Sequence, residues 1–203
     1  MKVCYLDHYD SFSFNLIDCL FSDRGVELLY LGLEELMEKG DSWFSNMPLV
    51  ISPGPHRPET LPSTVSCIRR HLGRVPILGV CLGHQCLGYA VGGRISHGKN
   101  PFHGSRQKIN VLQDFDSRVP LPSSFMAAQY NSLVIDRASM PREFVWATNE
   151  DDEVAGIMLK NWGQFPALGI QFHPESFLSE EKEALTAIWI HMVRDFYENT
   201  KVI

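Results

Sequence analysis

The feature that most constrains the fold is a short apolar segment, residues 75–80, which runs directly into a cysteine flanked by two glycines. The segment contains β-branched residues and predicts a buried strand, and residues 84–91 predict a helix. Gly79 and Gly83 have no side chains, and a sharp strand-to-helix turn requires such residues. Such a turn lifts the sulfur of Cys81 above the sheet edge and points a helix N-terminus at it, which favours the thiolate. The stretch therefore predicts a nucleophilic cysteine, with a buried structural cysteine as the alternative.

The residues before this turn alternate between strand-like and helix-like patterns. Asp10 or Ser11 is expected to cap the first helix, and Gly25 is expected to end it. The alternation predicts a parallel sheet with helices on both faces, in which ligands bind beyond the carboxyl ends of the strands. The expected strands are residues 2–7, 26–31, 48–52 and 75–80, and the expected helices include residues 33–39 and 60–72.

The pattern changes after the glycine pair at residues 92–93, where short strand-like pieces separated by polar turns predict antiparallel or mixed pairing. A final helix carries an apolar stripe between residues 185 and 196. We find no linker or internal repeat, so we expect a single domain over residues 1–203. The fold class is therefore α/β, with a mostly parallel, mixed central sheet and a smaller antiparallel sheet. The later strands are expected at residues 107–112, 125–127, 133–135, 145–148, 154–159 and 167–172.

Composition limits the class of function. The net charge is −6 and there is no block of basic residues, which argues against nucleic acid or an anionic membrane as a partner. No apolar run is long enough to cross a bilayer, and the N-terminus lacks a signal sequence. The chain has five cysteines, an odd number without paired spacing, which fits a reducing compartment and argues against structural zinc. These features predict a soluble, cytoplasmic protein without a metal site.

A proline-rich loop follows the third expected strand, over residues 53–59. Proline has no N–H, so the amide of Gly54 stands alone between Pro53 and Pro55 in a stiff segment. A rigid, isolated amide suits an oxyanion hole. An ordinary strand-to-helix turn is the alternative at this position.

The sequence His173-Pro174-Glu175 follows the last expected strand. Residues i and i+2 project to the same side of a strand, with Cα atoms about 7 Å apart. A carboxylate in that position can bond one imidazole nitrogen while the other faces outward. Cys81, His173 and Glu175 therefore predict a nucleophile, a general base and the group that orients the base. A surface turn with a local ion pair is one alternative; a metal site is another, although a third ligand at suitable spacing is missing.

Several motifs, taken together, resemble one family. Residues 79–85 (GVCLGHQ) and 171–176 (QFHPES) are similar to the two signatures of class I glutamine amidotransferases. Three further motifs resemble, more narrowly, the small glutaminase subunit of anthranilate synthase and aminodeoxychorismate synthase: residues 6–12 with Asn15 and Leu16, residues 51–55 (ISPGP) and residues 130–134 (YNSLV). The resemblance covers nearly the whole chain and implies the flavodoxin-like fold of that family.

The resemblance also implies a mechanism. Cys81 attacks the side-chain amide of glutamine with the help of His173, and the backbone N–H groups of Gly54 and Leu82 hold the oxyanion. Ammonia leaves, and water then hydrolyses the γ-glutamyl thioester to glutamate. Glu175 completes the triad.

The remaining site residues follow from the same resemblance. Gln85 and the backbone around Ser132 and Leu133 are expected to hold the amino-acid end of L-glutamine. The ammonia passes to a chorismate-utilising synthase subunit (component I), which makes anthranilate or 4-amino-4-deoxychorismate. No cofactor is implied on this subunit, because the magnesium of the family belongs to the partner.

Three positions depart from the family pattern: His56 replaces a small residue, Asn131 replaces a histidine, and Ser105 ends a His-Gly-Ser sequence where His-Gly-Lys is usual. They are expected in loops near the glutamine pocket or the partner surface, where they bear on basal glutaminase activity. A catalytically weak or inactive regulatory subunit, and a γ-glutamyl hydrolase with the same triad, are the alternative functions. The motifs do not distinguish tryptophan, folate and specialised-metabolite pathways.

Overall fold

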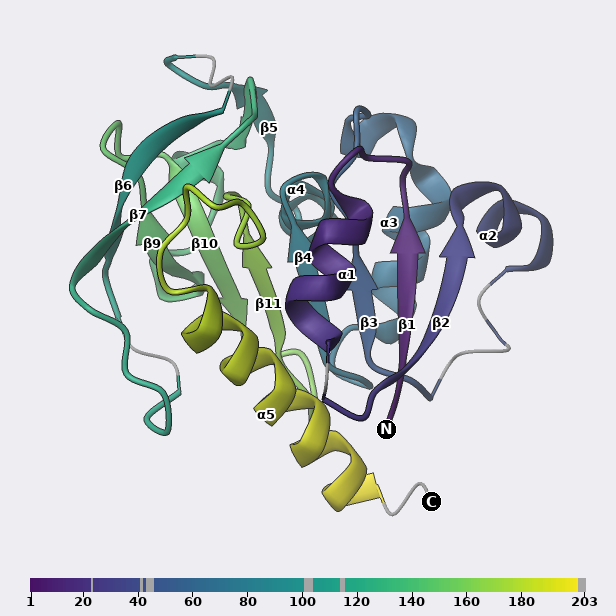
Figure 1. Cartoon of the computed structure of the whole chain (residues 1–203). Coiled ribbons are helices and arrows are strands. Elements are labelled where there is room, and N and C mark those ends of the chain that lie inside the picture. The colour runs from purple at the N-terminus through teal and green to yellow at the C-terminus, as the bar shows by residue number, and fades with distance from the viewer. Residues whose placement is uncertain (23, 41, 43–45, 101–103, 114–115, 201–203) are drawn as a thin grey trace.

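The computed structural model describes residues 1–22, 24–40, 42, 46–100, 104–113 and 116–200 of the chain. Its centre is a nine-stranded sheet in the order β2-β1-β3-β4-β11-β10-β9-β6-β7, beside a two-stranded sheet of β5 and β8 (Figure 1). The strands are β1 (Lys2–Asp7), β2 (Glu27–Gly32), β3 (Leu49–Ile51), β4 (Ile77–Val80), β5 (Ile95–His97), β6 (Ser105–Val111), β7 (Ser124–Gln129), β8 (Leu133–Ile135), β9 (Val145–Thr148), β10 (Val154–Leu159) and β11 (Ala167–Ile170). The α-helices are α1 (Ser13–Phe21), α2 (Leu33–Lys39), α3 (Pro62–His71), α4 (Leu82–Ala90) and α5 (Lys182–Thr200).

The large sheet is mixed, as the sequence predicts. Strands β2, β1, β3, β4 and β11 run parallel to one another, whereas β10, β9, β6 and β7 continue the sheet with antiparallel pairing. Gly79 of β4 lies opposite Ile51 of β3 on one side and Gly169 of β11 on the other. The carboxyl ends of these three strands therefore meet at one edge of the sheet, where ligands bind in folds of this kind.

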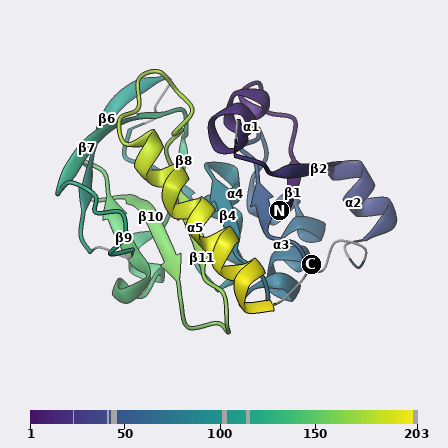
Figure 2. The same cartoon turned by 60° about the horizontal axis from the view of Figure 1, so that its bottom comes forward.

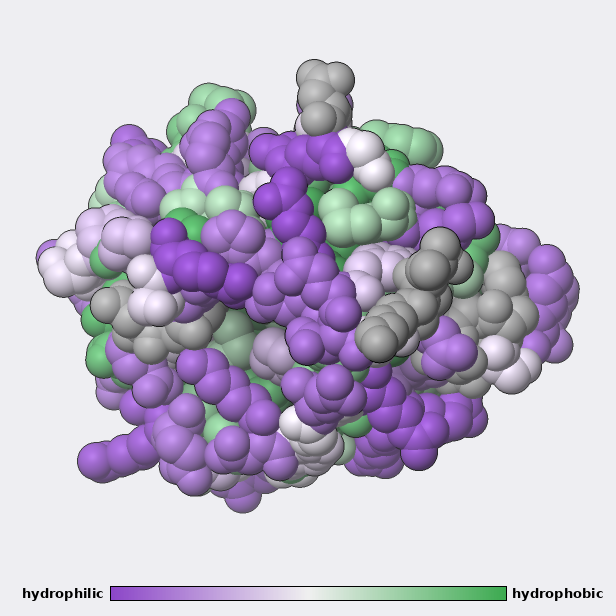
Figure 3. Space-filling view, turned by 90° about the horizontal axis from the view of Figure 1, so that it is seen from below, coloured by the Kyte–Doolittle hydropathy of each residue, from purple (hydrophilic) through white to green (hydrophobic). Residues whose placement is uncertain are grey.

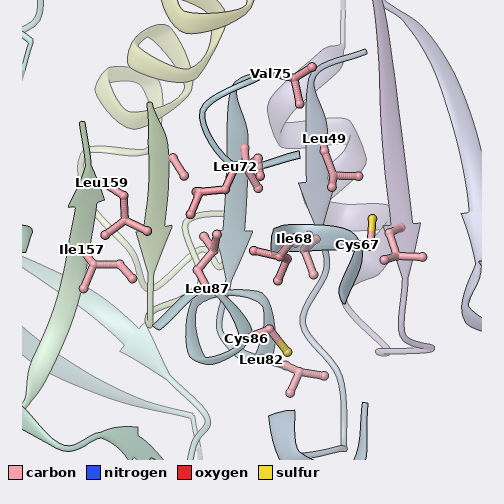
Figure 4. Close-up of a cluster of buried hydrophobic side chains, with 14 of the residues drawn as sticks. Leu49, Cys67, Ile68, Leu72, Val75, Leu82, Cys86, Leu87, Ile157 and Leu159 are labelled. Atoms are coloured by element: carbon pink, nitrogen blue, oxygen red, sulfur yellow. The ribbon is translucent and has the colours of Figure 1, made fainter. Parts of the chain in front are cut away.

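Helices cover both faces of the sheet (Figures 1 and 2). Helices α1 and α5 lie on one face, and α2, α3 and α4 lie on the other. Strand β1 shows why both faces are apolar: Val3 and Tyr5 belong to the core beneath α1 and α5, while Cys4 and Leu6 belong to the opposite core. Figure 4 shows part of this second core, with the side chains of Leu49, Cys67, Ile68, Leu72, Val75, Leu82, Cys86, Leu87, Ile157 and Leu159 labelled.

The start of α1 differs from the prediction. The helix begins at Ser13 with Phe12 in the capping position and no side-chain cap, so neither Asp10 nor Ser11 caps it. The Asp10 carboxylate instead accepts a hydrogen bond from the Phe12 N–H at 2.8 Å, which forms a turn before the helix. Gly25 does not end the helix, which stops at Phe21; it lies in the following turn with φ of +64°.

Strand β5 is absent from the strands expected from the sequence. The strand has three residues, and two of them, including His97, are exposed, so it lacks an apolar pattern. His103 of the His-Gly-Ser departure and Trp43 lie outside the described residues.

The face seen from below, at the amino ends of the parallel strands, is mostly hydrophilic (Figure 3). Among the helices that the structure describes, none has the length and apolar composition to span a membrane.

The wholly buried His84 of α4 makes stability depend on pH. Its side chain lies against β10 and β11, and burial lowers the pKa of the imidazole to about 3 from the usual 6.5. As pH falls below 6.5, the unfolded chain therefore binds a proton that the folded chain does not. From this residue alone we expect the free energy of unfolding to fall by about 1.4 kcal/mol for each pH unit below 6.5, down to about pH 3. Urea denaturation between about pH 7 and about pH 5 measures that slope, and His84→Gln is expected to make it shallower. Equal slopes for the two proteins would contradict this account.

Candidate active site

Cys81 lies at the turn between β4 and α4. Its backbone has φ of +52° and ψ of −102°, a conformation that is costly for a residue with a side chain and that concentrates at functional sites. The N–H of Cys81 donates to the carbonyl oxygen of Ile170 at 2.8 Å, which ties the turn to the end of β11. Helix α4 begins at the next residue, so its N-terminus adjoins the sulfur. The structure thus has the turn geometry that the sequence predicts.

The two glycines that flank Cys81 allow α4 to approach the sheet closely. A Cβ atom on Gly79 would lie 2.4 Å from the carbonyl oxygen of Gly83. A Cβ atom on Gly83 would lie 2.3 Å from the carbonyl oxygen of Ile51 in β3. Both distances are too short for a side chain, so the turn requires glycine at both positions. Each contact is with backbone, which cannot move aside without shifting a strand or the helix.

His173 and Glu175 follow β11, the strand next to β4. The His173 Nδ1 lies 2.6 Å from the Glu175 Oε1, and the two side chains are 2% and 0% exposed. The N–H of His173 donates to the carbonyl oxygen of Ala128, which holds the segment against β7. The edges of the Phe12 and Tyr130 rings pack against the imidazole. The expected contact between histidine and carboxylate is therefore present and buried.

The charge state of His173 reflects two opposing effects. Burial lowers its pKa, but the negative charges of Cys81 and Glu175 outweigh burial and hold the pKa well above its usual value. The buried Nε2 has no partner at hydrogen-bond geometry among the described residues, so it is available to a reacting group. The site therefore favours the charged imidazolium form of His173.

A cavity of about 170 Å³ opens beside Cys81. It contains every residue that the sequence predicts for glutamine and oxyanion binding, together with the departures His56 and Asn131. The third departure, Ser105, is not among its lining residues; it is exposed at the start of β6, so the expectation that it lies in a loop is wrong, and a place at the partner surface stays a prediction. The lining residues are Gly54, Pro55, His56, Cys81, Leu82, Gln85, Tyr130, Asn131, Ser132 and Leu133.

The wall that carries Gly54 is fixed from behind by His8. A Cβ atom on Gly54 would lie 2.7 Å from both the His8 Cβ and the Leu82 Cδ2, so the loop is held tightly between them. The His8 Nε2 is 2.9 Å from the Thr64 Oγ1, and the backbone N–H of His8 donates to the Ser52 Oγ at 2.8 Å. Burial lowers the pKa of His8 to about 4, so the ring is neutral near pH 7.

A second, larger cavity of about 330 Å³ lies between α1 and the start of α5. Glu175 is one of its lining residues, but Cys81 is not. The smaller cavity is the candidate active site because it contains Cys81, the predicted nucleophile. Within the described ranges, no group of three or more His, Cys, Asp or Glu residues is arranged to hold a metal ion.

Two features of the site were not expected from the sequence. The Gln171 Nε2 lies 3.6 Å from the Cys81 sulfur. The sequence contains an indication of this contact, because Gln171 is two residues before His173 and such residues project to the same side of an extended segment. The carbonyl oxygen of Leu133 accepts hydrogen bonds from the side-chain amides of Gln85 and Asn131, at 2.8 and 3.1 Å. Both of its lone pairs are therefore used within the protein.

Comparison with known proteins adds independent information. Residues 4–192 match the family described as Glutamine amidotransferase class-I. The Bifunctional protein TrpGD of Thermotoga maritima is 36% identical over 99% of this chain, which spans 34% of that protein. Aminodeoxychorismate synthase component 2 of Escherichia coli is 35% identical, over 93% of this chain and 99% of its own. Anthranilate synthase component 2 of Pseudomonas aeruginosa is 33% identical, over 90% of this chain and 91% of that protein.

A solved structure supports the fold. The crystal structure of a protein described as a GMP synthase subunit, from Thermoplasma acidophilum, superposes with a TM-score of 0.81, covering 99% of this chain and 98% of that chain. The two sequences are 20% identical, so this likeness concerns the fold alone.

The glycine contacts at the turn can be tested by adding one methyl group. Gly83→Ala is expected to lower the free energy of unfolding by about 1 to 3 kcal/mol and to slow alkylation of Cys81, because α4 must move away from β3. Gly25→Ala is the control: Gly25 has φ of +64°, unlike Gly83, but nothing lies within 4 Å of the added Cβ. The control is expected to cost about 1 to 2 kcal/mol of backbone strain and to leave Cys81 reactivity unchanged. Denaturation with urea and mass spectrometry of the alkylated peptide measure the two effects, and an unaffected Cys81 in Gly83→Ala would refute the argument.

Proposed function

Since the chain belongs to the class I glutamine amidotransferase family, we propose that it is the glutaminase subunit of a chorismate-aminating synthase. The observation that carries the proposal is the buried His173–Glu175 pair beside Cys81, which itself lines a cavity of about 170 Å³. The same cavity is lined by the residues that the sequence predicts for glutamine binding. The whole chain from residue 1 to 203 would act as one amidotransferase domain, and we place it in the cytoplasm.

The first half of the reaction uses the charged pair. The Cys81 thiolate attacks the side-chain carbonyl carbon of glutamine, and the oxyanion that forms is held by the backbone N–H groups of Gly54 and Leu82. The imidazolium of His173 gives its proton to the departing nitrogen. The C–N bond breaks, ammonia leaves, and the acyl group remains on the sulfur as a thioester.

The second half regenerates the enzyme. Neutral His173 takes a proton from water, whose oxygen attacks the thioester carbon. The C–S bond breaks, glutamate leaves, and the thiolate and imidazolium are restored. Glu175 keeps the ring oriented through both halves by accepting from Nδ1. The released ammonia stays neutral only if it is kept from water, so we propose that it passes directly to the synthase subunit (component I).

Gln85, Ser132 and Leu133 are proposed to hold the amino-acid end of glutamine. The carbonyl of Leu133 is already occupied, so Leu133 would meet the substrate through its N–H. Both protons of the Gln85 amide are used by Leu133 and Gln171, which leaves its oxygen for the substrate ammonium. The names of the relatives support both anthranilate and aminodeoxychorismate synthesis, and the product depends on the partner.

The central test uses the complex with the synthase subunit from the same source. Cys81→Ser is expected to abolish glutamine-dependent product formation and to preserve formation from added ammonia, because only the nucleophile is lost. Cys19→Ser is the control, since Cys19 lies outside the glutamine pocket. Loss of both activities in Cys81→Ser would show that the cysteine serves folding or docking instead.

Two other results would redirect the assignment. Failure of a glutamine-analogue electrophile to label Cys81, even with the partner present, would indicate an inactive regulatory subunit. Hydrolysis of γ-glutamyl peptides without any partner would indicate a γ-glutamyl hydrolase.

The pH profile tests the role of Glu175. The imidazolium of His173 is needed to protonate the leaving nitrogen, so kcat/KM is expected to fall as pH rises through the pKa of His173. Burial lowers that pKa while Cys81 and Glu175 raise it, so Glu175→Gln is expected to move the alkaline fall to lower pH. We also expect kcat to drop by about 100-fold or more. Glu183→Gln, at an exposed position of α5, is the control. An unchanged alkaline limb in Glu175→Gln would contradict the role.

A further inference from the structure

A buried glutamine contacts the nucleophile directly. Gln171 follows β11, is 0% exposed, and has its backbone N–H bonded to the carbonyl oxygen of Ala155 at 2.9 Å. Its side-chain Nε2 lies 3.6 Å from the Cys81 sulfur. The side chain is therefore held in place, and its amide meets a reacting atom of the proposed reaction.

The direction of this amide is determined by a chain of hydrogen bonds that begins at a carbonyl group. The carbonyl oxygen of Leu133 can only accept, so the Gln85 amide must present its nitrogen to it, at 2.8 Å. The same Gln85 nitrogen also donates to the Gln171 Oε1 at 3.1 Å. With its oxygen committed to Gln85, Gln171 must turn its N–H toward Cys81. The sulfur therefore faces a donor and not a carbonyl oxygen.

A donor at this place has a clear chemical effect. A buried cysteine without compensation stays protonated, as at Cys4, where burial raises the pKa of the thiol to about 12. Burial raises the pKa of Cys86 in α4 as well. An N–H that points at sulfur interacts more strongly with the thiolate than with the neutral thiol, because hydrogen bonds to charged groups are the stronger ones.

We propose that Gln171 is a catalytic residue whose side-chain N–H stabilises the Cys81 thiolate and aims it at the substrate, with its direction set by Leu133 through Gln85. This role rests on the proposed glutaminase function. It also links the glutamine pocket to the nucleophile, since Gln85 lines the pocket and bonds Gln171. In the attack step the sulfur loses its negative charge as the C–S bond forms, so it becomes a weaker acceptor for the Gln171 N–H. Gln171 itself transfers no proton and no electron.

The test measures alkylation of Cys81 by iodoacetamide as a function of pH, in the full chain, by mass spectrometry of the peptide that contains it. Gln171→Leu removes the donor. We expect it to raise the midpoint of the curve of alkylation rate against pH by about 1 to 2 pH units, which slows alkylation below that midpoint by about 10- to 100-fold. Gln171→Glu keeps the shape but places a carboxylate oxygen near the sulfur, so the midpoint should rise at least as far. Gln113→Leu is the matched control, because it removes an amide that makes two hydrogen bonds outside the pocket.

Kinetics with the synthase partner separate a catalytic role from a structural one. We expect kcat for glutamine to fall by about 10- to 100-fold in Gln171→Leu, with a smaller change in KM, while ammonia-dependent synthesis is retained. An unchanged alkylation midpoint in both Gln171 variants would overturn the proposal, even if activity were lost. If the midpoint moves but the wild-type complex never hydrolyses glutamine, the effect of Gln171 on the thiolate is supported and the proposed function fails.

Discussion

The position of Cys81 depends on the close approach of α4 to β3 and β4. Glycines at positions 79 and 83 let the helix backbone contact the strands without any intervening side chain. At the turn between these two glycines, Cys81 has a positive φ, which is costly for a residue with a side chain. Packing on both faces of the sheet provides the stability that opposes this cost. The strain places the sulfur at the helix N-terminus, beside the neighbouring strand β11, and the rest of the site is arranged around that point.

The arrangement of the strands determines which distant residues meet. Strands β3, β4 and β11 are parallel neighbours, although β4 ends at Val80 and β11 begins only at Ala167. Parallel neighbours end at the same edge, so the loop after β3, the turn after β4 and the segment after β11 form one site. A sheet with β11 at any other place in the order would separate His173 from Cys81 and leave two unrelated buried groups.

Much of this could be predicted from local chemistry, and the remainder could not. The bounds of β1, β8, β9, β10 and α2 agree with the expected ones, because hydrophobic period and turn residues are local signals. The motifs around Cys81 and His173 also have local signatures. The spacing of Gln171 from His173 is also local, but the direction of its amide has no local signature, since a distant carbonyl group, that of Leu133, sets it through Gln85. The short strand β5 likewise depends on pairing with β8, which only the folded chain provides.

Three buried histidines show how neighbours decide charge in the same protein interior. His8 and His84 are wholly buried, and burial lowers their pKa to about 4 and about 3. His173 is buried as well, yet its pKa is raised, because the negative groups of Cys81 and Glu175 both act on it. The linkage has opposite sign in the two cases: His8 and His84 destabilise the folded chain as pH falls below 6.5, whereas His173 stabilises it at low pH and loses that contribution as pH rises through its raised pKa. Near pH 7 the interior therefore holds two neutral rings that support the loop and the helix, while the third ring, beside Cys81, favours its charged form.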